Sequence, residues 1–196
     1  MNSLLIKGVM GSSLALALLA AGAAQAGTLT GVTFALANNA PSAVTTATFQ
    51  FKTETALAPG TFHNAPYLEL PGFSLNTDAA CTGVTMTVDG VPRVPNFCAI
   101  SVGSAIGVQT NAGISAGAIV VVSIPVTNPA TIGLKTTSFF RTSATPGNAV
   151  IDAPAAQPSV TIVAAVPTLS EWAMILFGLL LAGGAALYIQ RRQMAV

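Results

Sequence analysis

The sequence predicts an all-β ectodomain, an antiparallel β-sandwich, followed by a single C-terminal transmembrane helix. Three observations predict this architecture. Large apolar residues alternate with threonines at a period of two through the middle of the chain, which places them on one face of each strand. Turn-forming pairs of Asn, Asp, Pro and Gly separate these stretches. Near the C-terminus, one long apolar run is followed by two arginines.

The first 26 residues are predicted to be a signal peptide. Lys7 precedes an apolar stretch from Val9 to Ala21, which is too short to span a bilayer comfortably. Small residues then lead to Ala26, as signal peptidase requires, so Gly27 is the expected first residue of the mature protein. The alternative is a signal anchor that stays uncleaved.

Residues 27–151 are predicted to form the β-sandwich. Ala47, Phe49 and Phe51 show the alternation, since threonine and glutamine stand between them. Pro71 and Pro125 lie inside strand-like runs, which predicts edge positions or bulges because proline has no N–H to donate. We expect residues 152–165 to be a connector, with a last strand inside it. The predicted strands cover residues 32–36, 46–51, 67–75, 84–89, 97–102, 105–110, 118–127, 136–145 and 159–163.

Two cysteines, Cys81 and Cys98, are the only ones in the chain. In an exported protein they enter an oxidising compartment, so a structural disulfide is expected. It would hold the strand over 84–88 against the strand over 97–102, and would contribute about 3 kcal/mol by the chain-entropy estimate. The alternative is a reactive or metal-binding thiol pair, which lacks support because the one histidine, His63, is isolated.

No pattern in residues 27–165 predicts catalysis, a cofactor or a metal ion. Four basic and five acidic side chains are spread evenly over this part, which argues against nucleic acid as a partner. His63 has no evident partner, and no hydrolase, phosphate-loop or metalloprotease motif occurs. We therefore do not expect an enzyme, although two carboxylates could converge in space. The acids lack the spacing of a calcium loop; they include Glu69, Asp78, Asp89 and Asp152.

Three segments of the ectodomain resemble a known kind of module. They are Leu57-Ala-Pro-Gly60, Leu70-Pro-Gly-Phe-Ser-Leu75, and Val122-Ser-Ile-Pro-Val-Thr-Asn-Pro129 followed by Gly133. In this order they resemble segments of Thr-rich immunoglobulin-like modules of bacterial surface proteins. Pro125 departs from the glycine that is common there. The resemblance covers about a hundred residues and implies an immunoglobulin-like fold more than a function.

The C-terminal residues 166–192 form the most specific pattern. A polar motif is followed by an apolar helix over residues 172–189, whose length of about 27 Å is close to the thickness of a bilayer core. Arg191 and Arg192 would stop transfer and stay on the cytoplasmic side, as the positive-inside rule requires. The motif residues are Val166, Pro167, Thr168, Leu169, Ser170, Glu171 and Trp172.

Motif, helix and basic end together resemble the IPTL-CTERM sorting domain, a relative of the PEP-CTERM tails of Gram-negative bacteria. Val166 stands where the family has Ile, and Ala173 stands where Gly is common. The resemblance implies that an exosortase, a membrane-embedded enzyme similar to cysteine transpeptidases, recognises residues 166–172 and removes the tail. The alternative is a plain single-pass anchor, in which Trp172 is only an interfacial aromatic residue.

The expected function is that of a structural or adhesive protein of the cell surface or extracellular matrix. Its expected partners are signal peptidase, an exosortase-like enzyme, membrane lipid and exopolysaccharide. It would first be an inner-membrane-anchored precursor with a periplasmic ectodomain and a cytoplasmic C-terminus. The alternative is a membrane-anchored module that binds glycan or protein at the loops of the sandwich.

Overall fold

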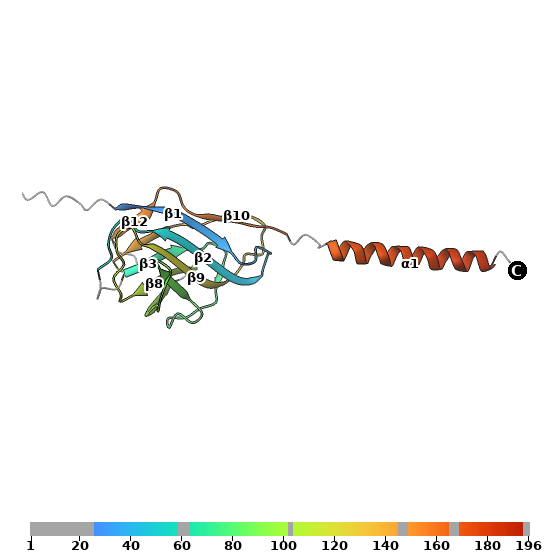
Figure 1. Cartoon of the computed structure of the whole chain (residues 1–196), viewed down its shortest axis with the longest axis horizontal. Helices are drawn as coiled ribbons and strands as arrows, with labels where there is room; N and C mark the ends of the chain where they lie inside the picture. Colours follow the sequence, from blue (N-terminus) through green and yellow to red (C-terminus); the bar gives the residue numbers. More distant parts are fainter. Residues whose placement is uncertain (1–25, 59–62, 102–103, 145–148, 165–168, 194–196) are drawn as a thin grey trace, which may run out of the picture.

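In the residues that it describes, the computed structural model contains thirteen strands and one helix. Figure 1 shows their arrangement. The structure describes residues 26–58, 63–101, 104–144, 149–164 and 169–193. The elements are β1 (Gly27–Leu36), β2 (Val44–Lys52), β3 (His63–Glu69), β4 (Ser74–Leu75), β5 (Thr85–Val88), β6 (Val91–Arg93), β7 (Phe97–Ser101), β8 (Ala105–Thr110), β9 (Ile119–Thr127), β10 (Gly133–Thr136), β11 (Phe140–Ser143), β12 (Val150–Pro154), β13 (Ser159–Ile162) and α1 (Leu169–Gln193).

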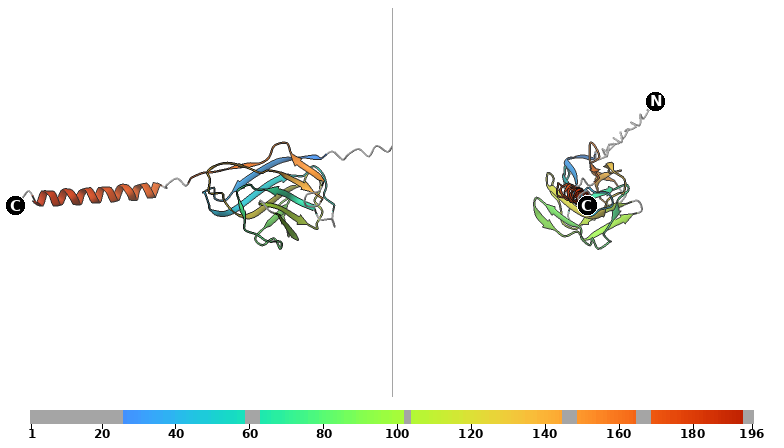
Figure 2. Two further views of the ribbon diagram at one scale, coloured as in Figure 1. Left: turned by 180° about the vertical axis from the view of Figure 1, so that it is seen from behind. Right: turned by 90° about the vertical axis from the view of Figure 1, so that its right-hand side faces the viewer.

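The predicted all-β class with one C-terminal helix is confirmed. Eleven strands form one hydrogen-bonded sheet in the order β6-β5-β9-β2-β1-β12-β11-β3-β8-β7, with β4 paired to β9. A second ribbon consists of β10 and β13. The left view of Figure 2 shows the strands as one body and α1 as a separate rod.

Strand β1 connects the two halves of the large sheet. Its residues 30–36 pair antiparallel with β2, and its first three residues pair parallel with β12. The register shifts between Thr30 and Thr33, where Gly31 has a φ of 60°. Such a bulge bends a strand, and here it directs the two ends of β1 to different neighbours. The sequence predicted an antiparallel sandwich, and the parallel pairing of β1 with β12 departs from that prediction.

Phenylalanine rings fill the space between the two halves. Phe49 of β2 stacks on Phe34 of β1 at 4.5 Å between ring centroids, and on Phe140 of β11 at 5.4 Å. Strands β2 and β11 are three steps apart in the sheet, which would be about 14 Å if the sheet were flat. The ring contact therefore shows that the sheet folds over and encloses an apolar core. The immunoglobulin-like resemblance itself stays a prediction.

The alternation of residues predicts this core correctly. Ala47, Phe49 and Phe51 are all completely buried, as the period of two requires. The same holds for the apolar set on β5, where Met86 and Val88 are buried. Removal of these side chains from water is the main stabilising term for the domain.

The two prolines expected at edge positions or bulges lie instead in a turn and in an inner strand with continuous register. Pro125 lies within the inner strand β9, opposite Thr46 of β2, at the position between the ends of β4 and β5. Its carbonyl accepts a hydrogen bond from the Asn76 N–H at 2.9 Å, so its nitrogen faces the same gap and no ladder bond is lost. Pro71 lies in the turn that separates β3 from β4 and thereby divides the strand predicted over 67–75.

The β domain extends past the expected boundary at residue 151. Residues 152–154, which we expected in the connector, belong to β12 and pair with the first residues of β1. The strand within the connector is β13, which pairs with β10. Sequence reasoning failed here because the composition of 150–158 resembles a linker, whereas its pairing partner lies more than a hundred residues earlier.

Candidate functional site

The C-terminal helix is long and apolar enough to cross a membrane. The window Trp172–Arg191 has 20 residues and a mean hydropathy of 2.0, and the rest of the protein buries none of it. At 1.5 Å per residue it spans about 30 Å, which matches the hydrocarbon core of a bilayer. An apolar helix of this length with no protein cover is typical of a membrane-spanning segment.

The polar motif continues directly into this helix. Val166, Pro167 and Thr168 lie outside the described residues, but α1 begins at Leu169, three residues earlier than the predicted start at 172. Leu169 to Trp172 therefore form the first turn. The spacing of Thr168 and Glu171 in the sequence matches a capping box, S/T-x-x-E, and this signal could have located the helix start.

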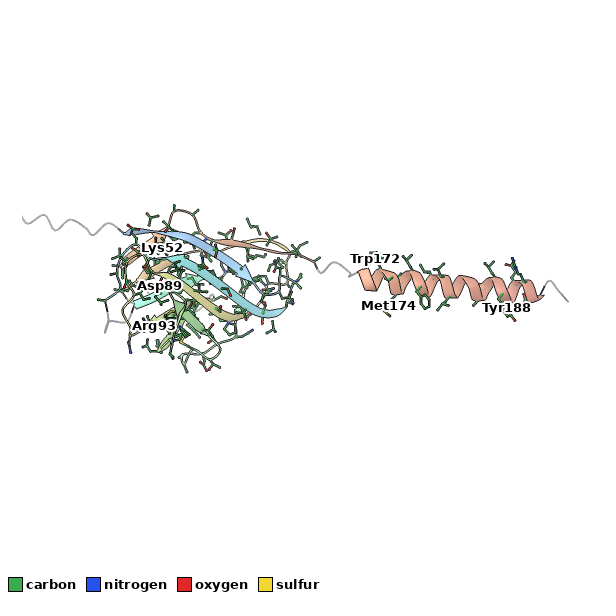
Figure 3. The ribbon with its side chains drawn as sticks, viewed as in Figure 1. Lys52, Asp89, Arg93, Trp172, Met174 and Tyr188 are labelled. Atoms are coloured by element: carbon green, nitrogen blue, oxygen red, sulfur yellow. A yellow bond between two sulfur atoms is a disulfide. The ribbon has the colours of Figure 1, made fainter. Side chains whose placement is uncertain are left out.

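Aromatic side chains mark both ends of the apolar span (Figure 3). Trp172 lies at its beginning and Tyr188 near its end, and both are exposed. Amphipathic rings are enriched at the two interfaces of a membrane, and arginines at the cytoplasmic side. Arg191 and Arg192 fall in the last turn of α1, beyond Tyr188. This order of residues is typical of a membrane-spanning helix.

Cys81 and Cys98 form a disulfide, with 5.2 Å between their Cα atoms. Cys98 lies on β7, at one end of the sheet order, and Cys81 lies in the loop before β5, near the other end. The bridge thus ties the two edges of the folded sheet together, and does not join neighbouring hydrogen-bonded strands. The Cys98 N–H also donates to the carbonyl of Ala79 at 3.1 Å. A backbone hydrogen bond and the disulfide therefore both hold β7 against the loop before β5.

Asp78 stabilises the loop that carries Cys81. Its carboxylate accepts hydrogen bonds from the N–H of Ala80 and the N–H of Thr82, each at 3.0 Å, and from the Thr82 hydroxyl at 2.8 Å. The bonds from the Thr82 backbone and side chain, together with that from Ala80, hold the pKa of this carboxyl below its ordinary value of 3.8. The negative charge of Asp78 therefore stabilises this loop.

Among the described side chains, Glu69, Asp89 and Asp152 lie on different elements. Asp89 begins the two-residue turn between β5 and β6, and its carboxylate accepts from the Ile119 N–H at 2.8 Å. Glu69 ends β3, and Asp152 is buried in β12. His63, expected in a loop, is the first residue of β3. Within the described residues, no three of His, Cys, Asp and Glu gather as a metal site would require.

Sequence reasoning missed one cluster on the outer face of β3 and β11. The Arg141 guanidinium carbon lies 5.2 Å from the ring centroid of Tyr67 and 5.0 Å from that of Phe139. The two rings are 4.8 Å apart. Tyr67 and Arg141 are direct cross-strand partners, so this is the kind of pair that stabilises a sheet. This contact follows only from the pairing register of β3 and β11, which local sequence patterns do not reveal.

A shallow hollow of about 420 Å³ lies between the β6–β7 loop and the end of β8. It is lined by residues 92–96 and 110–112, with Arg93 as its only charged side chain. An arginine among prolines, asparagine and threonine offers hydrogen-bond donors for hydroxyl or carbonyl groups. It offers no acid and base pair.

Comparison with known proteins bears on the tail. Residues 164–193 match the family model of the IPTL-CTERM motif. The chain carries an IPTL-CTERM tail. This motif implies an extracellular protein that is sorted by an exosortase-type enzyme, and together with the apolar helix it fits an exported, membrane-anchored precursor. No curated protein matches the chain.

A solved structure described as "AvmM Catalyzes Macrocyclization in Alchivemycin A Biosynthesis" also matches part of the chain. The two proteins share 8% sequence identity, and the match covers 70% of this chain and 92% of the other, with a TM-score of 0.31. At this TM-score the similarity supports no statement about function.

Proposed function

We propose that this protein is a structural or adhesive component of the cell surface or extracellular matrix, delivered there through its IPTL-CTERM tail. The observation that carries the proposal is the motif continuing directly into an uncovered apolar helix with arginines at its end. Signal peptidase frees Gly27, α1 holds the precursor in the inner membrane, and an exosortase-like enzyme then processes the tail. The ectodomain faces the periplasm and later the exterior, where exopolysaccharide surrounds it.

The ectodomain supports a passive role by how it uses its polar groups. Asp78 and Asp89 accept backbone hydrogen bonds in turns, and Arg141 lies over aromatic rings. A disulfide adds stability outside the cytoplasm, where the oxidising environment preserves it. Polar groups with these roles stabilise the fold. We therefore propose that the protein is not an enzyme.

The role is tested in the native host by deletion and complementation. Cells without the protein should lose surface attachment or matrix cohesion, while growth in suspension should be unchanged. Wild-type protein should restore the property. A variant with Pro167 and Thr168 replaced by alanine keeps the apolar helix but changes the motif, so it should be retained in the membrane and fail to restore it. A growth defect on a particular nutrient would contradict the structural role.

A second candidate function rests on the hollow beside β6. A module that binds glycan or protein could present residues 92–96 and 110–112 at the loops of the domain. A glycan array with the exported protein tests this, with Arg93→Ala as the variant and Lys135→Ala, on the separate β10–β13 ribbon, as the control. Binding that Arg93→Ala removes and Lys135→Ala retains would favour the binding module over the structural role.

A further inference from the structure

Asp152 carries a buried carboxylate that is only half satisfied. Its side chain is completely buried, and Oδ2 accepts hydrogen bonds from the N–H of Glu54 at 3.2 Å and the N–H of Thr55 at 3.0 Å. Oδ1 has no hydrogen-bond partner. A buried carboxylate oxygen without a donor is unfavourable, so such groups in proteins are normally paired.

The basic side chains of the β domain are placed elsewhere. The Arg141 guanidinium lies over the rings of Tyr67 and Phe139, and the Lys135 ammonium donates to Thr131 at 2.7 Å. The side chain of Lys52 extends toward Gly117, and Arg93 lines the hollow beside β6. Within the described residues, no basic side chain forms an ion pair with Asp152.

Gly27 faces the unsatisfied oxygen. It is the direct partner of Asp152 in the parallel pairing of β1 with β12. A Cβ placed on Gly27 would collide with Oδ1 of Asp152 and would lie 2.9 Å from the Cβ and Cγ of Glu54, so only glycine fits. The nitrogen of Gly27 is two bonds from that Cβ position and therefore lies within about 5 Å of Oδ1.

Signal peptide cleavage changes the chemistry of this nitrogen. In the precursor it is an uncharged amide with one hydrogen. Hydrolysis of the Ala26–Gly27 bond adds one water: the carbonyl carbon of Ala26 keeps the oxygen as a carboxylate and departs with the leader. The nitrogen of Gly27 becomes an amine, which takes up a proton near pH 7. The resulting ammonium has three donor hydrogens and a positive charge.

We infer that Asp152 is the binding site for the α-ammonium group that processing creates on Gly27. The inference rests on the export step of the proposed function. The ion pair fills the empty position at Oδ1 and neutralises the buried carboxylate. Because β1 joins the two halves of the sheet through this same end, removal of the leader strengthens the β1–β12 pairing. The domain therefore reaches its full stability only after the signal peptide has been removed.

The acetylation rate of the Gly27 α-amino group shows whether the ion pair forms. Full-length protein is produced in a bacterium that cleaves the leader, purified in detergent, and its N-terminus is established by mass spectrometry. Acetylation by an amine-reactive ester near neutral pH is then followed on Gly27, with Lys52 as the internal reference. An opposite charge at this range favours the protonated form of the amine, and the protonated form does not react. Asp152→Asn should therefore raise the rate at Gly27 at least tenfold.

Two further variants separate the ion pair from a loss of structure. Glu54→Gln removes the other carboxylate near Gly27 and should change the rate less than twofold, since Glu54 is exposed. One alanine inserted between Ala26 and Gly27 keeps Asp152 but moves the new ammonium about 3.5 Å farther along the chain. It should also raise the rate at the α-amino group about tenfold. Both the insertion and Asp152→Asn should lower the melting temperature, because both remove the ion pair at Oδ1.

Equal rates in the wild type, Asp152→Asn and the insertion variant would overturn the inference and leave export and sorting intact. A mature chain that begins elsewhere than Gly27 would overturn both the inference and the expected cleavage. Processing of the C-terminal tail is observed on the same samples through the presence or absence of residues 169–193, so failure of sorting is recognised independently.

Discussion

Removal of the Cys81–Cys98 bridge should destabilise the domain by about 3 kcal/mol. The cysteines are 17 residues apart, and closing a loop of that size in the unfolded chain costs about 3 kcal/mol by the chain-entropy estimate. Such a change raises the unfolded-to-folded ratio roughly a hundredfold. Because the bridge joins opposite edges of the folded sheet, its loss releases both edges at once. The double variant Cys81→Ala, Cys98→Ala is the perturbation.

Pulse proteolysis over a urea series measures the folded fraction of the β domain in the full-length protein. With an m-value of about 2 kcal/mol/M, a loss of 3 kcal/mol lowers the urea midpoint by about 1.5 M. Wild-type protein treated with a reductant is the control: its midpoint should fall to that of the double variant, because both lack the cross-link. Equal midpoints for the oxidised wild type and the double variant would refute this reasoning.

Three further perturbations test the packing, the turns and the electrostatics of the domain. Phe49→Ala should destabilise it by about 3–5 kcal/mol, measured by urea unfolding, because the ring is fully buried between two others. Gly83→Ala should cost more than Gly90→Ala in the same assay: both have φ near 75°, but only at Gly83 would the new Cβ lie 2.8 Å from Pro125. Asp78→Asn should lower the melting temperature at neutral pH. Because folding lowers the pKa of this carboxyl, its contribution is present above the unfolded value of 3.8, and the difference from wild type should shrink as the pH falls below it.

Local patterns in the sequence were sufficient for the strands of the core and for the tail. Phe49 and Phe51 are buried because alternation places them on one face, and alternation is visible within six residues. The apolar helix and its terminal arginines are likewise local, and the matched motif covers the same residues. The cysteine pair followed from the count of cysteines and the compartment, without knowledge of the strands that carry them.

Pairings between distant segments could not be predicted. Strand β1 pairs with both β2 and β12 because it has a bulge at Gly31. One glycine in a sequence does not reveal such a bulge. Asp152 was assigned to a connector because alanine and proline follow it, yet its carboxylate is buried by contacts with residues 54 and 55. The contact of Arg141 with Tyr67 depends on strand register, which a one-residue shift would abolish.

The mass of the mature protein from its native host shows whether the C-terminal tail is removed. One epitope tag is placed in the exposed turn between β12 and β13, at residues 155–156, and another after Val196. The protein is purified from wild-type cells and from cells that lack the exosortase. If the tail is a sorting signal, the mature protein in wild-type cells keeps the first tag and loses residues 169–193 with the second. The full-length form should accumulate without the enzyme, or when Pro167 and Thr168 are alanine. Full-length, tail-bearing protein as the only stable species in wild-type cells would contradict the account and identify α1 as a plain anchor.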